Sequence, residues 1–186
     1  MKNLNLFFEK YEDQFNKILR HSFFQNKKEI IELTKVLRKI NKLNKVILIG
    51  NGGSAAIASH ASIDFNKVAN IKSINFTDNS NMTALSNDIG YNNVFSENLK
   101  YVANKNDILI AISSSGNSIN IINAIKISRK MKFSKVITFT GMKPNNKVRK
   151  LGDINIWVNS NIYNFIENIH QIILLSCIDS FNDIKF

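Results

Sequence analysis

From Lys45 onward, short apolar runs alternate along the chain with segments of helical periodicity. The five apolar runs lie at 46–50, 73–76, 108–112, 136–140 and 154–158. The runs at 46–50 and 108–112 contain no polar side chain at all, as expected of strands buried on both faces. Parallel strands need long crossover connections, which the intervening helices would supply. The alternation predicts an α/β fold with a doubly wound, five-stranded parallel sheet of the flavodoxin-like or Rossmann-like kind.

Helices are predicted on either side of these strands and ahead of them. Those between and after the strands are expected at about 54–69, 82–86, 94–104, 118–132, 144–150 and 162–183. Two more, at 3–24 and 27–43, precede the first strand and have one apolar face each. The apolar face of the first is rich in aromatic residues and needs a packing partner, for which another copy of the chain is one candidate. We therefore expect a helical N-terminal arm at 1–44 and an α/β domain at 45–186.

The chain carries a formal net charge of +11, from 25 Lys and Arg against 14 Asp and Glu. The basic residues are spread over the whole length, with the densest clusters at 27–45 and 143–150, and only 4 of them are Arg. Proteins that bind nucleic acid usually gather cations on one face and use Arg freely. We therefore expect a solvated basic surface and no nucleic-acid partner, although this charge favours an anionic substrate.

Cys177 is the only cysteine, so no disulfide can form within one chain. It lies in an apolar run, where a buried and inert thiol is the ordinary expectation. The first residues do not follow the layout of a signal peptide, and no apolar stretch reaches the about 18 residues of a membrane span. These features predict a cytoplasmic protein without a membrane partner.

Two predicted strands run into turns of small polar residues, and each turn leads directly into a helix. The first turn is GNGGSA at 50–55, and the second is SSSGNS at 113–118. Backbone N–H groups at a helix start lack intrahelical partners, and the helix dipole favours a negative group there. Glycines permit close approach of a ligand, and hydroxyls add donors. Because parallel strands end at one edge of the sheet, the turns predict a site for a phosphate group on a small ligand.

Other interpretations of the first turn are open. Gly50, Gly52 and Ala55 formally match the relaxed dinucleotide-binding fingerprint, but the candidate acidic partner, Asp78, comes 28 residues after Gly50 rather than about 20. No Gly-Lys-Ser/Thr follows, so the turn is not a Walker motif. A plain turn that needs glycines is a further alternative. The four serines and one Asn of the second turn exceed what a turn requires, so together the two turns favour a phosphosugar.

The motifs of this chain resemble those of the sugar isomerase (SIS) domain family. They are GNGGSA, SNDIGY at 86–91, VF at 94–95, NDILIAISSSGNS at 106–118 and an IExxH in the closing helix. The resemblance covers about 46–180, and the N-terminal helices also fit the family layout. Within the family, the chain is most similar to the phosphoheptose isomerases, also called sedoheptulose 7-phosphate isomerases.

The resemblance implies a SIS phosphosugar-binding domain at 45–186 and an arm at 1–44 that serves oligomerisation. It implies an aldose–ketose isomerase that converts sedoheptulose 7-phosphate to D-glycero-D-manno-heptose 7-phosphate for nucleotide-heptose, lipopolysaccharide or capsule biosynthesis. It also implies a homotetramer built around helices such as 3–24, with pockets shared between subunits. The alternative is a non-catalytic SIS module that binds a phosphosugar or a protein partner in a regulatory role.

Two His–carboxylate pairs are the candidate acid–base groups. His60 and Asp64 are four residues apart on one predicted helix, and Glu167 and His170 are three apart on another, so each pair shares a face. Such a pair can move protons or bind a divalent metal ion. The alternative for each pair is an ordinary structural hydrogen bond. His21, beside two phenylalanines, is interpreted as structural.

The resemblance assigns these residues more narrowly. His60 stands at a family His, and Asp64 replaces the Glu that follows four residues later. On the closing helix Glu167 stands at a family Gln, His170 at a first His, and Leu175 at a second His. Family members use the Glu and the second His for proton transfer, and some bind zinc through this cluster. We therefore expect Glu167 as the base, His60, Asp64 and His170 as acid partners, and zinc held by His60, Asp64 and Glu167 as the candidate cofactor.

The remaining candidates would contact the sugar phosphate. The hydroxyls expected on the phosphate belong to Ser54, Ser113, Ser115 and Ser118, with Ser114 and Asn117 in support and with the backbone of Gly52 and Gly53. Asn51 and Asp88 are expected at the sugar hydroxyls, because the resemblance places them at the pocket. The only other partner we expect is a further copy of the chain.

Overall fold

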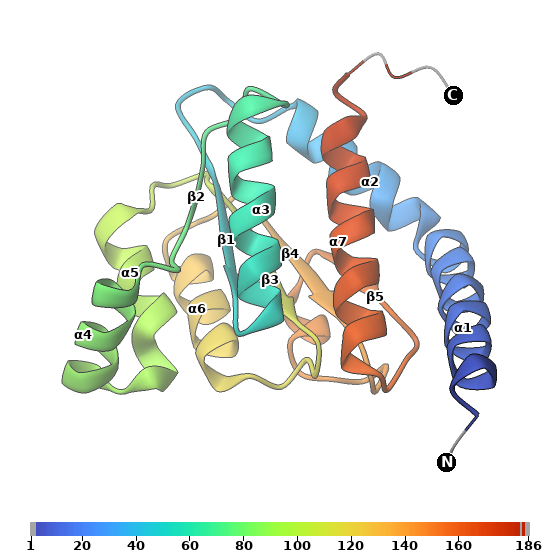
Figure 1. Ribbon diagram of the computed structural model, residues 1–186. Coiled ribbons are helices and arrows are strands. Elements are labelled where there is room, and N and C mark those ends of the chain that lie inside the picture. The colour runs from blue at the N-terminus through green and yellow to red at the C-terminus, as the bar shows by residue number, and fades with distance from the viewer. Residues whose placement is uncertain (1–2, 183, 185–186) are drawn as a thin grey trace.

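The computed structural model describes residues 3–182 and residue 184 (Figure 1). The elements, in chain order, are α1 Leu4–Gln25, α2 Lys27–Arg38, β1 Val46–Gly50, α3 Gly53–Lys67, β2 Ser73–Asn75, α4 Asn79–Ile89, η1 Tyr91–Asn93, α5 Val94–Val102, β3 Ile108–Ser113, α6 Ile119–Lys130, β4 Lys135–Thr140, η2 Arg149–Leu151, β5 Ile154–Trp157 and α7 Tyr163–Asp179. Here η1 and η2 are short 3₁₀ helices. The predicted alternation of strands and helices is confirmed.

The five strands form one parallel sheet in the order β2-β1-β3-β4-β5. The chain leaves β1 toward β2 on one side and then crosses to β3 on the other, so the winding direction reverses between β1 and β3. Gly50 at the end of β1 pairs with Ile112 in β3, which places the ends of these two strands side by side. A reversal of this kind opens a crevice beyond the carboxyl ends of the strands, where ligands bind in doubly wound folds.

Helices cover both faces of the sheet. α2, α3 and α7 pack on one face, together with the second half of α1, and α4, α5 and α6 pack on the other (Figure 1). Val46 and Leu48 of β1 face the first layer, whereas Ile47 and Ile49 face the second. All positions of β1 and β3 are therefore buried, which is why these strands lack polar alternation. Each such side chain contributes about 1.5–3 kcal/mol through burial.

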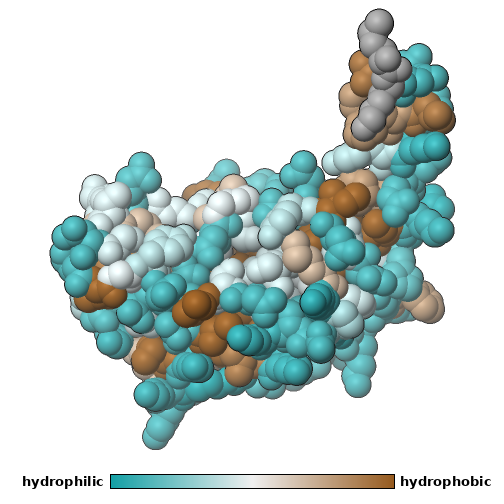
Figure 2. All heavy atoms as spheres, turned by 90° about the horizontal axis from the view of Figure 1, so that it is seen from below, coloured by the Kyte–Doolittle hydropathy of each residue, from teal (hydrophilic) through white to brown (hydrophobic). Residues whose placement is uncertain are grey.

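Helix α1 is only partly covered by the rest of the chain. Tyr11 and Phe15 pack edge-on against Phe165 of α7, with ring centroids 4.6 and 5.4 Å apart from it. Toward its N-terminus, Phe7 and Phe8 are exposed. Figure 2, which views the molecule from the edge where the strands end, shows this part of α1 standing out from the body with brown apolar surface on it. The apolar stripe predicted for this helix is therefore only half buried within one chain.

Several element bounds differ from the sequence prediction; α7, for example, ends at Asp179, ahead of the predicted 183. The helix expected at 144–150 is mostly turn, because the Asn146 side chain bonds the carbonyl of Lys143 and the N–H of Arg149, leaving only the 3₁₀ turn η2. α2 ends at Arg38, ahead of the predicted 43. α4 is longer than predicted, because Asp78 caps it by accepting from the N–H of Asn81 at 2.8 Å. Asp78 thus has a structural role here, which argues against the dinucleotide alternative.

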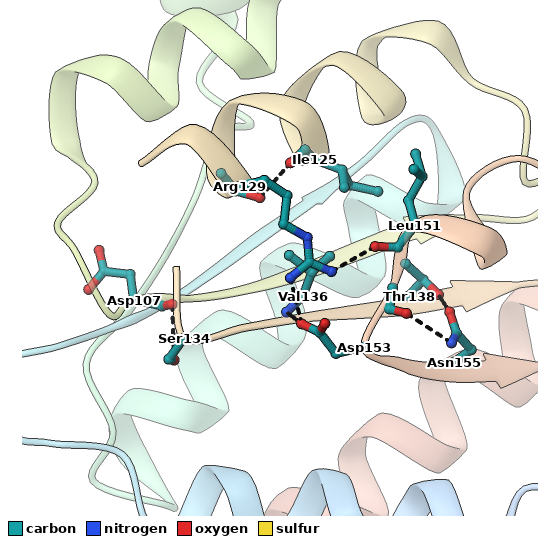
Figure 3. A network of polar contacts seen from close by, with 11 residues as sticks. Asp107, Ile125, Arg129, Ser134, Val136, Thr138, Leu151, Asp153 and Asn155 are labelled. Atoms are coloured by element: carbon teal, nitrogen blue, oxygen red, sulfur yellow. Dashed lines mark hydrogen bonds and ion pairs between the residues drawn. The ribbon is translucent and has the colours of Figure 1, made fainter. Parts of the chain in front are cut away.

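A polar network ties the end of α6 to the starts of β4 and β5 (Figure 3). Asp153 Oδ2 accepts from Arg129 Nη1 at 2.8 Å and from the backbone N–H of Val136 at 2.7 Å. Arg129 Nη2 donates to the carbonyl of Leu151 at 2.8 Å. This anchor lies at the amino ends of the strands, far from the edge where the two predicted turns meet.

No helix in the described part of the chain is long and apolar enough to cross a membrane.

Candidate active site

The turns after β1 and β3 lie side by side and enclose a small hollow. Its volume is about 130 Å³. The lining residues are Asn51, Ser54, Ile112, Ser113, Ser114, Ser115, Ser118, Tyr163 and Glu167. Six of the predicted hydroxyl and amide groups and the predicted base thus come together, whereas Tyr163 was not predicted. Larger hollows on the molecule lie along α1 and α2 or at the opposite edge of the sheet, and none of them contains a predicted site residue.

The start of α3 forms one wall of the hollow. Gly52 caps the helix with φ +55° and ψ −123°, a conformation that only glycine adopts readily. No side chain in the described part of the chain caps this helix start. The N–H groups of Ser54 and Ala55 already donate to the carbonyls of Asn51 and Gly52, so only those of Gly52 and Gly53 are left for a ligand. Gly52 and Gly53 lie between Asn51 and Ser54, which line the hollow, but they are not themselves part of its lining, so their predicted contact with the phosphate stays a prediction.

The start of α6 forms the opposite wall. The hydroxyls of Ser113 and Ser118 lie 3.1 Å apart, and Ser118 stands at the N-cap without using its side chain as a cap. Gly116 has φ +66°, and a Cβ added there would lie 2.1 Å from Oδ1 of the buried Asn146. The loop at 143–149 thus holds the serine turn from behind. This wall offers hydroxyl and N–H donors and no charge of its own, which suits a phosphate group.

Glu167 reaches into the hollow from α7. The Ser114 hydroxyl donates to Glu167 Oε1 at 3.2 Å, and the Ser54 and Ser114 hydroxyl oxygens are 3.4 Å apart. Oε2 lies directly over Gly53, because a Cβ added to that glycine would be only 2.2 Å from it. The carboxylate is therefore held at the start of α3, and it is the only charged group that lines the hollow.

Asn51 is held by two residues that the sequence did not single out. It exchanges two hydrogen bonds with the buried Asn120 of α6, at 3.0 and 2.9 Å. The Tyr91 hydroxyl donates to Asn51 Oδ1 at 2.7 Å. Asn120 could have been found as a polar residue on the inner face of a helix, and Tyr91 ends the SNDIGY motif. This network fixes the amide of Asn51 at the rim of the hollow.

His60 and Asp64 form the expected pair but lie outside the hollow. His60 Nε2 is 3.2 Å from Asp64 Oδ2, and Gln171 Nε2 is 3.2 Å from His60 Nδ1. A carboxylate only accepts, so Nε2 of His60 carries a proton, and Nδ1 then accepts from the Gln171 amide. Gln171 was not predicted, although it lies four residues after Glu167 on the same face of α7. Both ring nitrogens of His60 are thus occupied by side chains.

His170, which we expected as an acid partner of Glu167, points the other way. It is fully buried, with Nε2 3.0 Å from the carbonyl of Thr140 and its ring edge-on to Phe139. Burial lowers the pKa of His170 to about 4, although the bond to Thr140 opposes the shift. Three residues along α7 change the direction of the side chain by about 60° around the helix axis. This is enough to place His170 in the core beside Thr140 and Phe139 while Glu167 lines the hollow.

Two further candidates also lie away from the hollow. Asp88 is exposed at the end of α4 and accepts from the Asn87 amide at 3.0 Å. Asn117 is exposed, and its amide donates to the carbonyl of Ser115 at 3.0 Å, so it shapes the serine turn from outside. The structure places neither side chain against the hollow.

The residues suggested for zinc are not brought together. The carboxylate of Glu167 is held by Ser114 over Gly53, whereas His60 and Asp64 contact each other and Gln171. Leu175 packs against the apolar core. Across residues 3–182 and 184, no three His, Cys, Asp or Glu side chains are grouped so that they could hold a metal ion. This donor set does not fit a three-ligand zinc site.

Comparison with known proteins agrees with the geometry of the site. Residues 10–141 match the SIS domain, which is most of the chain. The chain belongs to the SIS domain family. A phosphoheptose isomerase of Aliarcobacter butzleri is 41% identical over 133 residues, which cover 68% of this chain and 69% of the relative. One of Buchnera aphidicola subsp. Schizaphis graminum is 36% identical over 174 residues, covering 86% and 88%. The chain therefore belongs to the phosphoheptose isomerase branch of the SIS family.

Solved structures show the same SIS fold. The phosphoheptose isomerase of Neisseria gonorrhoeae superposes with a TM-score of 0.90 at 24% identity, covering 97% of this chain and 100% of that one. That of Francisella tularensis superposes with a TM-score of 0.87 at 24% identity, covering 97% and 98%. Both match over nearly the whole length, including the N-terminal helices, so the predicted α/β fold with its helical arm is confirmed.

Proposed function

We propose that the protein is a phosphosugar isomerase that converts sedoheptulose 7-phosphate, a ketose, to D-glycero-D-manno-heptose 7-phosphate, the matching aldose. The observation that carries this proposal is the hollow at the switch point, where a serine turn faces a carboxylate, in a chain of the phosphoheptose isomerase branch. One wall suits a phosphate group, and the other carries a base. A non-catalytic SIS module would not need a carboxylate held inside its ligand site.

The substrate phosphate would bind at the start of α6. The hydroxyls of Ser113, Ser115 and Ser118 and the N–H groups of the turn would donate to its oxygens. The sugar would then extend toward α3, where Asn51 is held in place to meet a hydroxyl. The carbonyl end of the sugar would lie near Glu167.

Glu167 would act as the base of an enediol mechanism. Its carboxylate removes a proton from C1 of the ketose, the electrons of that C–H bond form a C1=C2 double bond, and the carbonyl oxygen takes up a proton. The enediol then receives a proton at C2, and the C1 hydroxyl loses its proton as C1 becomes the aldehyde. The Ser54 hydroxyl, which lines the hollow, would stabilise the charge on the enediolate oxygen. His60 and Asp64 do not line the hollow, so we assign both proton transfers at carbon to Glu167.

We propose that this reaction proceeds without a bound metal ion. What supports this is the donor geometry, since His60 is occupied by Asp64 and Gln171 while Glu167 is held elsewhere. Glu167 must then remove the proton from carbon without a metal ion that polarises the substrate carbonyl.

We further propose that the enzyme works in the cytoplasm as a homotetramer and supplies heptose for a nucleotide-heptose used in surface polysaccharide. The exposed apolar end of α1 supports oligomerisation, since monomeric proteins rarely leave such a stripe uncovered.

The decisive experiment is to incubate purified protein with sedoheptulose 7-phosphate and measure the aldose product, with and without a chelator. We expect turnover that the chelator leaves unchanged. Glu167→Gln should lower kcat at least about 100-fold, because general-base catalysis is worth that much. Asp179→Asn, which removes an exposed carboxylate from the same helix, should change kcat less than twofold. Binding of the sugar phosphate without turnover would overturn the enzyme assignment and support the regulatory module.

A further inference from the structure

The carboxylate of Glu167 lies against one of the two turns that the sequence predicts to bind an anion. Oε1 accepts from Ser114, and Oε2 lies over Gly53 at the uncapped start of α3. A helix start with free N–H groups is where an anionic ligand group would otherwise bind. The turn that resembles a phosphate cradle in sequence thus has, in the folded chain, a carboxylate of the chain itself packed against it at Gly53.

The hollow therefore has two halves of opposite preference for anions. The α6 half, with Ser113, Ser115 and Ser118, offers only neutral donors. The α3 half holds Glu167, the one charged group in the lining. The whole space is about 130 Å³, so a second anionic group on a ligand would come within a few ångströms of the carboxylate. Like charges at such a distance repel strongly in a partly dehydrated site.

We propose that Glu167 determines which ligands the site admits, by rejecting sugar phosphates that carry a second anionic group at their carbonyl end. Such ligands include sugar bisphosphates and phosphorylated aldonic acids, whereas a monophosphate with a neutral carbonyl end is accepted. The same charge fixes the direction of binding, because a phosphate placed against α3 would meet the carboxylate. The proposal rests on the proposed function, since it takes a sugar phosphate as the ligand of the α6 half.

Two ligands and one isosteric substitution test this proposal. Sedoheptulose 7-phosphate and sedoheptulose 1,7-bisphosphate differ by one phosphate group at C1. Titration calorimetry should show the wild-type protein binding the bisphosphate at least about tenfold more weakly than the monophosphate. Glu167→Gln keeps the size of the side chain and removes its charge, so it should raise the affinity for the bisphosphate at least about tenfold. Its affinity for the monophosphate should stay within about threefold, because the α6 half is unchanged.

The controls distinguish an effect of the Glu167 charge from unfolding of the variant and from an error in the proposed function. Asp179→Asn should leave both affinities unchanged, and thermal melting should show that Glu167→Gln is folded. Inorganic phosphate should bind the wild type through the α6 half, and Glu167→Gln should bind it at least as tightly, because the substitution removes a negative charge from the lining. This inference is overturned if the ratio of monophosphate to bisphosphate affinity is the same in the wild type and Glu167→Gln, or if the wild type prefers the bisphosphate. The proposed function still holds in that case, provided that the wild type converts the monophosphate. Failure of the wild type to bind or convert sedoheptulose 7-phosphate overturns both.

Discussion

At the scale of single residues, the role of each side chain on α7 depends on the direction in which it leaves the helix. Glu167 and His170 are three residues apart on α7, yet the carboxylate enters the hollow while the imidazole enters the core. The imidazole donates from Nε2 to the carbonyl of Thr140, and Nδ1 has no hydrogen-bond partner in the described chain. His170 is therefore a packing residue that must stay neutral.

This burial predicts a loss of stability at mildly acidic pH. The pKa of His170 falls from 6.5 to about 4 on folding, so only the unfolded chain takes up a proton between these values. The free energy of unfolding should be fully present above about pH 6.5 and should fall, by up to about 3 kcal/mol, as the pH drops toward 4. Denaturant unfolding at pH 7.5 and 5 measures this slope. His170→Gln should flatten it, whereas His21→Gln on the exposed side of α1 should not; equal slopes in all three proteins would contradict the prediction.

Gly53 gives a second prediction at this scale. A methyl group at Gly53 would overlap Oε2 of Glu167, which sits at the end of a flexible side chain and can shift away. Gly53→Ala should therefore keep its thermal stability within about 1 kcal/mol, because alanine suits a helix, while kcat falls at least about tenfold through displacement of the base. Gly52→Ala should instead lose about 1–3 kcal/mol, because its backbone conformation is strained for any side chain. Steady-state kinetics and melting curves on both variants check this contrast, and a fully active Gly53→Ala would show that Glu167 need not lie there.

At the scale of elements, an ion pair between Arg129 and Asp153 connects the end of α6 to the sheet. Burial raises the pKa of Asp153, but the hydrogen bonds from Arg129 and from the N–H of Val136, with the nearby charges, bring it below its usual value. The ion pair lies at the amino ends of the strands (Figure 3), so it stabilises the α6 helix without touching the ligand.

Arg129→Ala should accordingly lower the free energy of unfolding by about 1 kcal/mol and leave kcat and KM for the sugar phosphate unchanged. The energy is small because both side chains are partly exposed, and it should shrink further in high salt. Lys126→Ala, one turn earlier on the exposed face of α6, is the matched control and should change stability by less than about 0.5 kcal/mol. A loss of activity in Arg129→Ala at normal stability would mean that the anchor also positions the serine turn.

At the scale of the whole molecule, the N-terminal arm leaves apolar side chains exposed in a single chain. Tyr11 and Phe15 of α1 pack on Phe165, whereas Phe7 and Phe8 nearer its start are exposed. Figure 2 shows the N-terminal end of α1 standing out from the body of the molecule. If this end is the contact between copies, Phe7→Asp with Phe8→Asp should convert the tetramer to smaller species, because a charge is costly in an apolar contact. Light scattering measures the mass. Lys10→Asp, on the same helix, controls for added charge, and a wild-type protein that is monomeric would refute the assembly.

Much of this architecture follows from local patterns in the sequence. Five short apolar runs that alternate with helical segments predict strands, and the crossovers between them make those strands parallel. The inner strands β1 and β3 are buried at every position, whereas the edge strands β2 and β5 are partly exposed. The turns at 50–55 and 113–118 follow strands of one parallel sheet, which is why they were predicted at the same edge, and the structure places β1 directly beside β3. The helix predicted at 144–150 failed because side-chain bonds of Asn146, which no periodicity reports, hold a turn there.

The sequence alone therefore determined the fold, the two turns and the set of donors, because each depends on spacing within a strand, a turn or one helix face. Only the tertiary structure decided which acid–base residues share a space. It joined Glu167 to Ser114 and Gly53, paired His60 with Gln171, and enclosed His170 beneath Thr140. Those outcomes depend on how α7 is rotated against α3 and the sheet, which is set by the packing of many apolar side chains at once.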